Sequence, residues 1–324
     1  MVCAESHLKP GEASKNMRVL VTGSSGTIGT ELCLELLKGH ELQGVDVRPN
    51  QWSPAVSERT MLRDLRKPLD LDSCDMAIHL AANARVWDLV QNPGLARDNF
   101  EMLFNVLEYA RVHDVKRFLF ASSREVYGNS DKHVHHEDEA YVKNCESPYT
   151  ASKIGGEALV HSYQQCYGID FVIVRFSNVY GRYDLSTRVV PRFISQAIAG
   201  QPLVVYGKDK VLDFTFISDA VDGILSCISR FGSVQNDTFN IASGTGSTLT
   251  EVAQAVTRLL RSRSEMRLEG SRTGEVVKYI ADISKARRLL AFAPKVSLED
   301  GLRQSVAWYS NVNLSPLEHR QGRS

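Results

Sequence analysis

The chain has 324 residues, of which 43% are hydrophobic, and its 38 Lys and Arg face 38 Asp and Glu, a formal net charge of zero. This length suits one large domain or two smaller domains that share a cleft. A net charge of zero provides no overall field that would draw the protein to nucleic acid or to a membrane surface, which excludes both as expected partners. Any anionic ligand must therefore be bound by local groups.

The cysteines and the chain ends indicate the compartment. The six cysteines, at positions 3, 33, 74, 145, 166 and 227, form no CxxC pair and lack the crowding of a secreted disulfide scaffold. We therefore expect reduced thiols and a cytoplasmic protein. Residues 1–16 are polar without an apolar signal core, and residues 312–324 are equally polar, so we interpret both as flexible extensions.

Short apolar runs alternate with helical patterns over the first half of the chain. The runs MRVLVTG, ELQGVDV, DMAIHLAA, VKRFLFASS and DFVIVRFSNVYG predict strands, most of them buried on both faces. Such alternation predicts an α/β fold with a Rossmann-like, doubly wound parallel sheet.

After Gly181 the rhythm changes to RVVPRFISQAIAG, PLVVYG, LDFTFISDAVDGIL, FNIASG, TLTEVAQAVTRLLRS and a closing helix near 298–309. These shorter elements predict a smaller mixed α/β region. We expect residues 17–180 to form the first domain, with 213–240 returning to it, and residues 181–212 and 241–311 to form the second region. The two parts are expected to share one cleft, because no long linker separates them.

The first strand runs into TGSSGTIGTELCLELL, in which Gly23, Gly26 and Gly29 are spaced three apart and a helix starts at about Gly26. Glycines allow a pyrophosphate to approach the backbone, and the helix N-terminus offers free N–H groups. Asp46 ends the second strand twenty residues after Gly26, where a carboxylate can accept hydrogen bonds from the ribose hydroxyls of NAD. Arg48 lies close to Asp46, so NADP stays an alternative cofactor. The alternative role of Asp46 is to cap the end of the strand.

Tyr149 and Lys153 are four residues apart in SPYTASKIGGEAL, so they share one helix face. A free tyrosine has a pKa of about 10 and is a poor base at neutral pH. We expect the ammonium, together with a nicotinamide cation, to lower the pKa of this phenol. Ser122 and Ser123 end the strand in FLFASSREVYG, at the sheet edge where ligands of such folds bind. Each of these features also occurs by chance on helices and strand ends, but their order along the chain is specific.

Those motifs closely resemble the extended short-chain dehydrogenase/reductase family, and within it the nucleotide-sugar epimerases and dehydratases. The resemblance spans about residues 17–309 and is carried by VTGSSGTIG, HLAANARV, DNFEMLFNVLEYAR, FASSREVYG, SPYTASKIGGE, VRFSNVYG and TGEVVKYIADISKARRLLAFAPKVSLEDGL. It implies that residues 17–180 bind NAD and that the second region binds the nucleotide sugar. Helices at 94–112 and 149–167 would pair in a homodimer.

The resemblance also implies roles for single residues. The implied cofactor-binding residues are Gly23, Gly26, Thr27, Ile28, Gly29, Asp46, Arg48, Asp64, Leu65, Ala81, Ala82, Asn99, Tyr149 and Lys153. Ser123, Tyr149 and Lys153 would carry catalysis, with Glu125 as a further candidate whose alternative role is structural. The candidate substrate-binding residues are Ser122, Ser123, Arg124, Asn178, Arg192 and Arg272, and the last of these would clamp the diphosphate with its planar guanidinium.

Two departures from the family pattern bear on the reaction. Leu212 stands where many relatives have a phosphate-binding arginine, and Lys208 or Lys210 could compensate. Arg124 stands where dehydratases of the family have the first residue of an Asp-Glu pair, while Glu125 matches the second. Without the first acid, elimination of water loses a proton donor, which favours epimerisation. Glu125 leaves decarboxylation or an unusual dehydration open.

The histidines of DKHVHHEDEA could be drawn as a metal site, but His135 and His136 are adjacent in a polar loop and would point apart. We therefore expect no metal, and we expect Cys145 to be a passive thiol. The function predicted from the sequence is an NAD-dependent 4-epimerase of a nucleoside-diphosphate sugar, most plausibly linked to UDP. The rival enzymes are decarboxylases, dehydratases and reductases of the same family, and a remote rival is a non-catalytic NAD-binding regulator.

Overall fold

The computed structural model describes residues 16–312, and its main element is a seven-stranded parallel sheet in the order β11-β7-β5-β4-β1-β2-β3. Its strands are β1 (Arg18–Thr22), β2 (Glu41–Asp46), β3 (Thr60–Leu62), β4 (Met76–His79), β5 (Arg117–Ser123), β7 (Asp170–Phe176) and β11 (Asp237–Ile241). Nearly every residue of β1, β4, β5 and β7 is buried, so the prediction of strands covered on both faces is confirmed.

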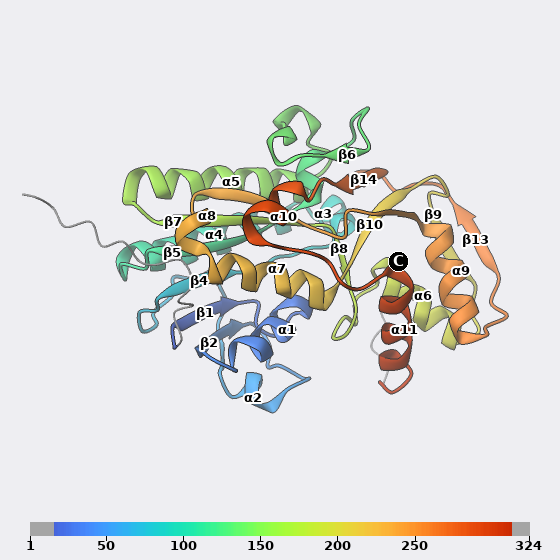
Figure 1. The fold of residues 1–324 in the computed structure, drawn as a ribbon, viewed down its shortest axis with the longest axis horizontal. Coiled ribbons are helices and arrows are strands. Elements are labelled where there is room, and N and C mark those ends of the chain that lie inside the picture. Colours follow the sequence, from blue (N-terminus) through green and yellow to red (C-terminus); the bar gives the residue numbers. More distant parts are fainter. Residues whose placement is uncertain (1–15, 313–324) are drawn as a thin grey trace, which may run out of the picture.

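Helices cover both faces of this sheet (Figure 1). The helices of the chain are α1 (Thr27–Leu36), α2 (Pro54–Ser57), α3 (Val86–Gln91), α4 (Gly94–Val112), α5 (Pro148–Tyr167), α6 (Val189–Ile198), α7 (Ile217–Ser229), α8 (Phe231–Val234), α9 (Leu249–Leu260), α10 (Ser284–Leu290) and α11 (Leu298–Tyr309). Short 3-10 helices lie at η1 (Arg124–Tyr127), η2 (Glu137–Glu139) and η3 (Val142–Asn144).

Alternate side chains of each strand enter two different cores. Val19 and Val21 of β1 pack with α1 and α7, whereas Leu20 between them packs with α4 and α5. This alternation follows from the two-residue period of a strand. The sheet is therefore sandwiched between two helical layers, which confirms the predicted doubly wound α/β fold.

A second group of elements adjoins the sheet, and its strands β9 and β13 with helices α6, α9 and α11 lie at the right of Figure 1. Its strands are β6 (Val134–His135), β8 (Asn178–Tyr180), β9 (Leu203–Tyr206), β10 (Val211–Phe216), β12 (Gly246–Thr248), β13 (Met266–Glu269) and β14 (Lys278–Ala281). β10 pairs in parallel with β8 and β14 and antiparallel with β12, which gives the mixed sheet expected for the second region. Helices α6, α9 and α11 pack together beside it.

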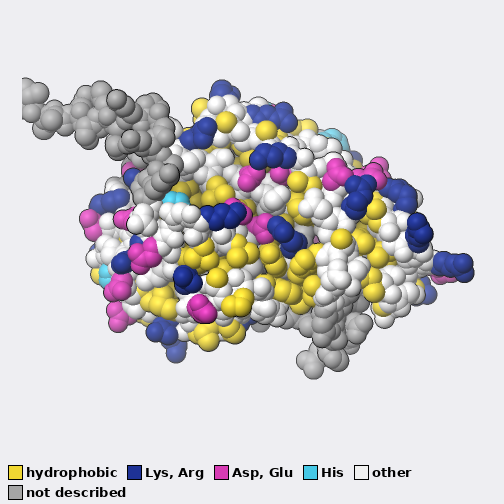
Figure 2. Space-filling view, turned by 60° about the horizontal axis from the view of Figure 1, so that its bottom comes forward, with side chains coloured by type: hydrophobic (Ala, Val, Ile, Leu, Met, Phe, Trp, Pro, Cys, Tyr) yellow, Lys and Arg dark blue, Asp and Glu magenta, His cyan; other side chains and the backbone are white. Residues whose placement is uncertain are grey.

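Charges of both signs are interspersed around a largely hydrophobic central area on the face in Figure 2. This distribution agrees with the net charge of zero. Between residues 16 and 312, no helix combines the length and the apolar character needed to cross a bilayer. The predicted extensions at 1–15 and 313–324 lie outside the described residues.

Candidate active site

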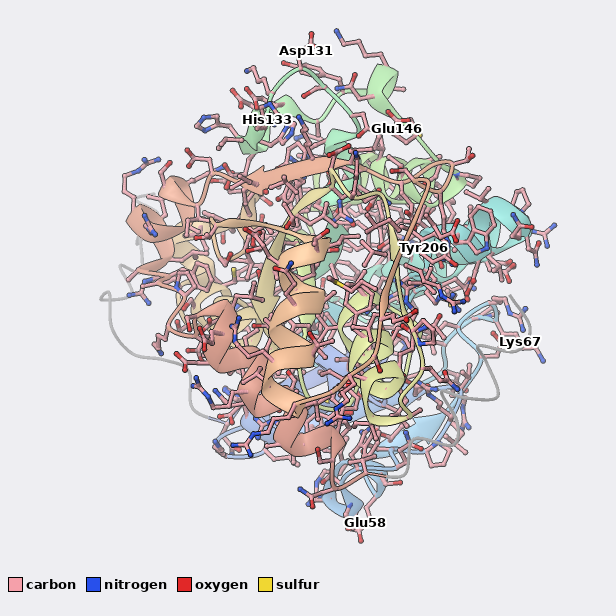
Figure 3. All side chains as sticks on the ribbon, turned by 90° about the vertical axis from the view of Figure 1, so that its right-hand side faces the viewer. Glu58, Lys67, Asp131, His133, Glu146 and Tyr206 are labelled. Carbon is pink, nitrogen blue, oxygen red and sulfur yellow. The ribbon has the colours of Figure 1, made fainter. Side chains whose placement is uncertain are left out.

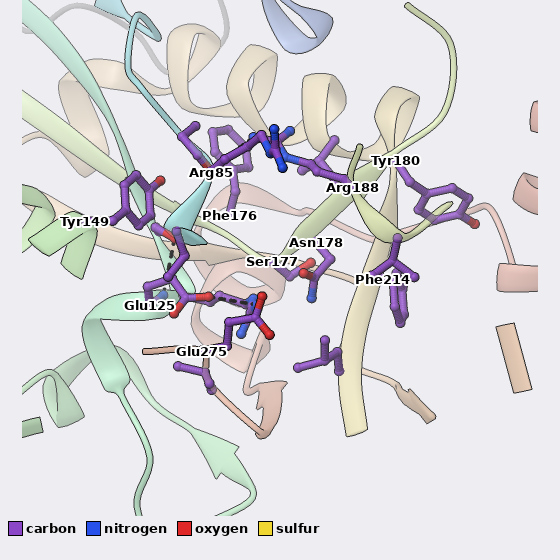
Figure 4. Close-up of a pocket in the computed structure, with 18 of the residues that line it drawn as sticks. Arg85, Glu125, Tyr149, Phe176, Ser177, Asn178, Tyr180, Arg188, Phe214 and Glu275 are labelled. Atoms are coloured by element: carbon purple, nitrogen blue, oxygen red, sulfur yellow. Dashed lines mark hydrogen bonds and ion pairs between the residues drawn. The ribbon is translucent and has the colours of Figure 1, made fainter. Parts of the chain in front are cut away.

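A cleft opens between the carboxyl ends of the central strands and the second region. Its walls come from the start of α1 (Ile28), the loop after β4, the end of β5 with η1, the start of α5, β8 and α6. The cleft is where open α/β sheets bind their ligands. Of the predicted residues, the ones that line it are Ile28, Ala82, Ser122, Ser123, Arg124, Glu125, Tyr149, Lys153, Asn178, Arg192, Lys210, Leu212 and Arg272. Figure 4 shows Tyr149, Glu125 and Glu275 along one side of it.

Tyr149 and Ser123 meet at the floor of the cleft. Tyr149 sits in the first turn of α5, which starts sharply because Ser147 caps the backbone N–H of Thr150 and Pro148 occupies the first position. The phenol is 7% exposed. Burial raises the pKa of Tyr149, while the hydrogen bond with Ser123 and the charge of Arg188 oppose that rise. The protein's own groups therefore leave the phenol protonated, and the expected lowering of its pKa, which includes the charge of the nicotinamide, stays a prediction.

Lys153 lies one turn further along α5 and is 5% exposed. Its Nζ donates a hydrogen bond to the carbonyl of Ala121, 2.7 Å away, and lies 5.9 Å from the centre of the Tyr149 ring. Burial lowers the pKa of Lys153 to about 8, and the carboxylate of Glu157 opposes that shift. The lysine thus points at β5 as well as toward the phenol, which explains why it does little to the pKa of Tyr149 in the protein alone.

Ser122 and Ser123 point to opposite sides of β5. Ser123 accepts a hydrogen bond from the N–H of Glu125, 3.2 Å away, and so faces the start of η1. Ser122 instead donates its hydroxyl proton to Glu157 at 2.5 Å. This engagement leaves only Ser123 with a hydroxyl next to Tyr149.

Two ion pairs line the cleft. Arg124 lies 2.8 Å from Glu125, and both are buried. Burial raises the pKa of Glu125, and Arg124 opposes the rise. Lys210, proposed from the sequence as a phosphate contact, is instead paired with Glu275, while Lys208 is exposed.

Three arginines without a carboxylate partner also line the cleft. Within residues 16–312, no ion pair joins Arg188, Arg192 or Arg272 to an acid. Arg192 is 8% exposed, and burial together with Arg272 lowers its pKa to about 10. The guanidinium of Arg272 stacks 3.9 Å above the ring centre of Tyr206. Of these three arginines Arg192 is buried, Arg272 is partly buried and Arg188 is exposed. Cations without a paired acid form a site that suits a diphosphate.

Asn178 lines the cleft, and its side-chain amide donates a hydrogen bond to the carbonyl of Asp213, 2.9 Å away. Leu212 is 4% exposed and also lines the cleft. An apolar side chain therefore occupies the place where the sequence comparison with the family suggested an arginine.

The glycine loop fits a dinucleotide pyrophosphate. Gly23 has φ +74°, and a Cβ on Gly29 would lie 2.0 Å from the carbonyl oxygen of Gly23, so neither position tolerates a side chain. Gly26 caps α1 without any side-chain hydrogen bond, which leaves the N–H groups of Thr27 and the next residues free to bind an anion. Thr27 itself donates its hydroxyl to the carbonyl of Tyr183.

Asp46 closes this loop. Its carboxylate accepts hydrogen bonds from the N–H of Ser25 at 3.0 Å and from the N–H of Arg48 at 3.2 Å. The carboxylate is thereby fixed beside the glycine turn, at the place a ribose needs, while the Arg48 side chain is exposed. Because a carboxylate repels a phosphate on the ribose, this end fits NAD better than NADP.

The remaining predicted cofactor-binding residues differ in their side-chain contacts and burial. Asp64 is held by Arg66, whose hydrogen bond lowers the pKa of Asp64. Leu65 is 3% exposed with its side chain in the core. Asn99 accepts from the N–H of Asn83 at 2.7 Å and so shapes the loop that contains Ala81 and Ala82.

The histidines of the segment DKHVHHEDEA lie in different surroundings. His135 is buried and stacks on Tyr127 and Tyr279, whereas His136 is exposed and His133 lies at the outer edge of the molecule (Figure 3). Between residues 16 and 312, no group of three or more His, Cys, Asp or Glu side chains is arranged to hold a metal ion. The Cys145 thiol donates a hydrogen bond to the carbonyl of Ser147, 3.5 Å away.

Several cleft residues were missed by the sequence reasoning. Arg188 and Tyr206 lie in segments to which no role was assigned, and Glu275 lies in the TGEVVKYIADISKARR motif but was not singled out. The fold brings all three to the cleft. Glu157 could have been found, because it follows Lys153 by four residues and must share its helix face.

Comparison with known proteins agrees with this geometry. A family model described as "NAD dependent epimerase/dehydratase family" matches residues 19–242. The chain is similar to "Uncharacterized UDP-glucose epimerase YtcB" of Bacillus subtilis, with 32% identity over 91% of this chain and 99% of that protein. It is also similar to "UDP-glucuronic acid decarboxylase 1" of Danio rerio, with 30% identity over 94% of this chain and 74% of that protein.

Among solved structures, UDP-glucose 4-epimerase of Thermus thermophilus in complex with NAD aligns with a TM-score of 0.83 and 27% identity, covering 92% of this chain and 100% of that one. The chain therefore belongs to the NAD dependent epimerase/dehydratase family of enzymes, whose cofactor is NAD.

Proposed function

We propose that this protein is an NAD-dependent 4-epimerase of a UDP-linked sugar. The observation that carries the proposal is the meeting of Ser123 and Tyr149, with Lys153 one turn away, in a cleft that also contains three arginines without acid partners. Relatives named as UDP-glucose epimerases support this choice of substrate.

In the proposed reaction, NAD held by the glycine loop and Asp46 would supply the hydride acceptor for C4 of the sugar and the hydride donor for its return to the opposite face. Ser123 orients the 4-hydroxyl by a hydrogen bond, and Tyr149 takes the proton of that hydroxyl and gives it back. Lys153 contributes a positive charge 5.9 Å from the ring centre, which would favour the ionised phenol although it does little to the pKa in the protein alone. Positive charge brought close by the cofactor would add to this stabilisation, since the protein's own groups leave the pKa of Tyr149 raised.

Arg192 and Arg272 would bind the diphosphate of the substrate, and Asn178 would contact the same group. The glycine loop with Asp46 would bind the pyrophosphate and adenosine ribose of NAD, and Asp64, Leu65, Ala81, Ala82 and Asn99 would shape its remaining site. The protein's contribution is to position the two ligands and to tune charge, because the redox chemistry belongs to the cofactor.

Glu125 favours one alternative. A buried carboxyl group with a raised pKa, next to Ser123, could act as an acid or a base toward the sugar. A decarboxylase or dehydratase would use it in this way, whereas an epimerase needs it only for structure. Its pairing with Arg124 supports the structural role.

The two functions differ in product mass. We would incubate the protein with UDP-, GDP- and dTDP-sugars and analyse the products by mass spectrometry and NMR. An unchanged mass with inverted C4 supports the proposal, while loss of water or carbon dioxide contradicts it.

We propose that residues 17–180 and 213–240 bind NAD and that residues 181–212 and 241–311 bind the nucleotide sugar. Within 213–240, α7 packs on α1 and β11 joins the large sheet, but β10 pairs in the second sheet. The cleft between the parts is therefore built from interleaved segments of chain.

We also propose a homodimer formed through α4 and α5, in the cytoplasm. Phe100 and Phe104, four residues apart on α4, are 40% and 43% exposed, and Tyr167 at the end of α5 is 49% exposed. Exposed aromatic side chains on two packed helices favour association with a second copy. Light scattering after gel filtration measures the mass directly, and a monomer at micromolar concentration would contradict this part.

A further inference from the structure

A third polar side chain follows the proposed catalytic pair along α5. Tyr149, Lys153 and Glu157 are spaced by four residues, so all three project from one face of the helix toward the sheet. The Glu157 side chain is only 12% exposed. The reaction proposed above assigns it no task.

Glu157 is held from two strands. Arg175 of β7 makes two parallel hydrogen bonds to its carboxylate, 2.9 Å from Nε to Oε1 and 2.7 Å from the terminal nitrogen to Oε2. Ser122 of β5 donates to Oε1 at 2.5 Å. A bidentate pair of this kind fixes both position and orientation.

The hydrogen bonds continue beyond Arg175. Its other terminal nitrogen donates to the Tyr127 hydroxyl at 3.0 Å and to the carbonyl of Glu137 at 2.6 Å. Tyr127 in turn donates to the side-chain oxygen of Asn240 on β11 at 2.6 Å. The network thus joins α5 to β5, β7 and β11 and prevents the carboxylate from turning away.

Lys153 has few charged neighbours. On α5 it faces Tyr149 and Glu157, and on β5 it donates to the carbonyl of Ala121. On β4, His79 lies near, but burial and Lys153 lower the pKa of His79 to about 3, so the ring is neutral. Glu157 is therefore the negative charge that offsets the burial of the ammonium.

We propose that Glu157 is a positioning residue that keeps Lys153 charged and aligned with Tyr149, while Arg175 holds Glu157 in place and tempers its charge. This inference rests on the proposed function for its effect on turnover, but its electrostatic part concerns the protein without ligands. The two partners of the ion pair must then act on Lys153 in opposite directions, because one is an anion and the other a cation.

The direct test follows the titration of lysines labelled with ¹³C at Cε by NMR in the protein without ligands. A Lys153→Met variant identifies the resonance. In Glu157→Gln we expect the pKa of Lys153 to fall by about half a unit or more, because the offsetting anion is gone. In Arg175→Gln we expect it to rise, because Ser122 still holds the carboxylate, whose charge then acts on Lys153 unopposed by the guanidinium.

Opposite shifts of the Lys153 pKa in the two variants distinguish this role from mere support of the fold. Loss of support would shift the Lys153 pKa in the same direction in both variants. An unchanged pKa, or shifts of one sign, would overturn the inference. If Glu157→Gln does not fold, the Lys153 pKa in Arg175→Gln is the criterion: a rise supports the inference, and a fall or no change overturns it. The double variant Glu157→Gln with Arg175→Gln replaces the ion pair by a neutral pair for comparison. Glu101→Gln, at an exposed position of α4, is the matched control and should leave Lys153 unchanged.

Turnover provides a second readout with the NAD-loaded enzyme. In Glu157→Gln the alkaline fall of kcat should move to lower pH while KM changes little, and Arg175→Gln should move it to higher pH. Because the NMR titration needs no substrate, opposite pKa shifts without any epimerisation would refute the proposed function and leave the role of Glu157 standing.

Discussion

Replacing Lys153 by methionine is expected to stabilise the protein while abolishing its activity. A methionine has similar length and no charge, so it removes the cost of keeping an ammonium in a buried site. The pKa of this lysine is lowered from 10.5 to about 8 by burial. Each pKa unit corresponds to about 1.4 kcal/mol, so the burial of the charge costs about 3 kcal/mol at neutral pH.

The stabilisation gained by removing the buried charge is partly offset. The variant loses the hydrogen bond from Nζ to the carbonyl of Ala121, worth about 1 kcal/mol. We therefore expect the free energy of unfolding of Lys153→Met to exceed that of the natural protein by about 2 kcal/mol at pH 7, in the absence of ligands.

The stability difference between Lys153→Met and the natural protein should depend on pH. Below pH 8 the lysine is charged in both the folded and the unfolded state, so the full cost is present. Between about pH 8 and 10.5 the folded protein loses the proton first, the unfolded chain binds more protons, and the cost disappears as pH rises. The advantage of the variant should therefore shrink over this range and reverse slightly above it.

Urea unfolding of both proteins without NAD, at several pH values from 7 to 10.5, measures the difference. Lys67→Met, at an exposed position seen in Figure 3, is the control and should show no such pH-dependent gain. A Lys153→Met protein that is less stable at pH 7, or whose advantage is the same at every pH, would refute the reasoning.

Other predictions concern ligands and the glycine turn. Tyr149→Phe should bind NAD as tightly as the natural protein but lose about 100-fold or more in kcat, since it cannot accept a proton, and retained turnover would remove Tyr149 from the role of base. Arg272→Ala should raise KM for a UDP-sugar at least about tenfold with little change in NAD affinity, measured by calorimetry, whereas an unchanged KM would place the diphosphate elsewhere. Gly29→Ala should lower the melting temperature and NAD affinity together, because its Cβ would lie 2.0 Å from the carbonyl oxygen of Gly23, and a fully stable variant would contradict that geometry.

Most of the large sheet could be predicted because its central strands are apolar and separated by helices, whereas the three-residue strand β3 was missed. The closing helix, expected near 298–309, is found at Leu298–Tyr309, and α4 matches its predicted bounds. Strands β6 and β13 were missed. β6 has two residues, and every residue of β13 is exposed, so neither shows the alternation or apolar run that marks a strand.

The site was predictable only where a local motif carries the chemistry. The glycine turn, Ser123, Tyr149 and Lys153 belong to such motifs, and the fold brings the last three together. Their electrostatics could not be predicted, because the pKa values depend on burial and on partners distant in sequence, such as Arg188 for Tyr149. Lys210 illustrates the same limit, since its partner Glu275 lies 65 residues away.

The most direct test of the account uses a UDP-sugar that carries deuterium at C4, turned over in ordinary water and analysed by NMR. If a hydride leaves C4 and returns to the same carbon, the epimer with inverted C4 keeps its deuterium and the mass is unchanged. Loss of the label to solvent, with hydrogen at C4 of the product, would contradict the central claim.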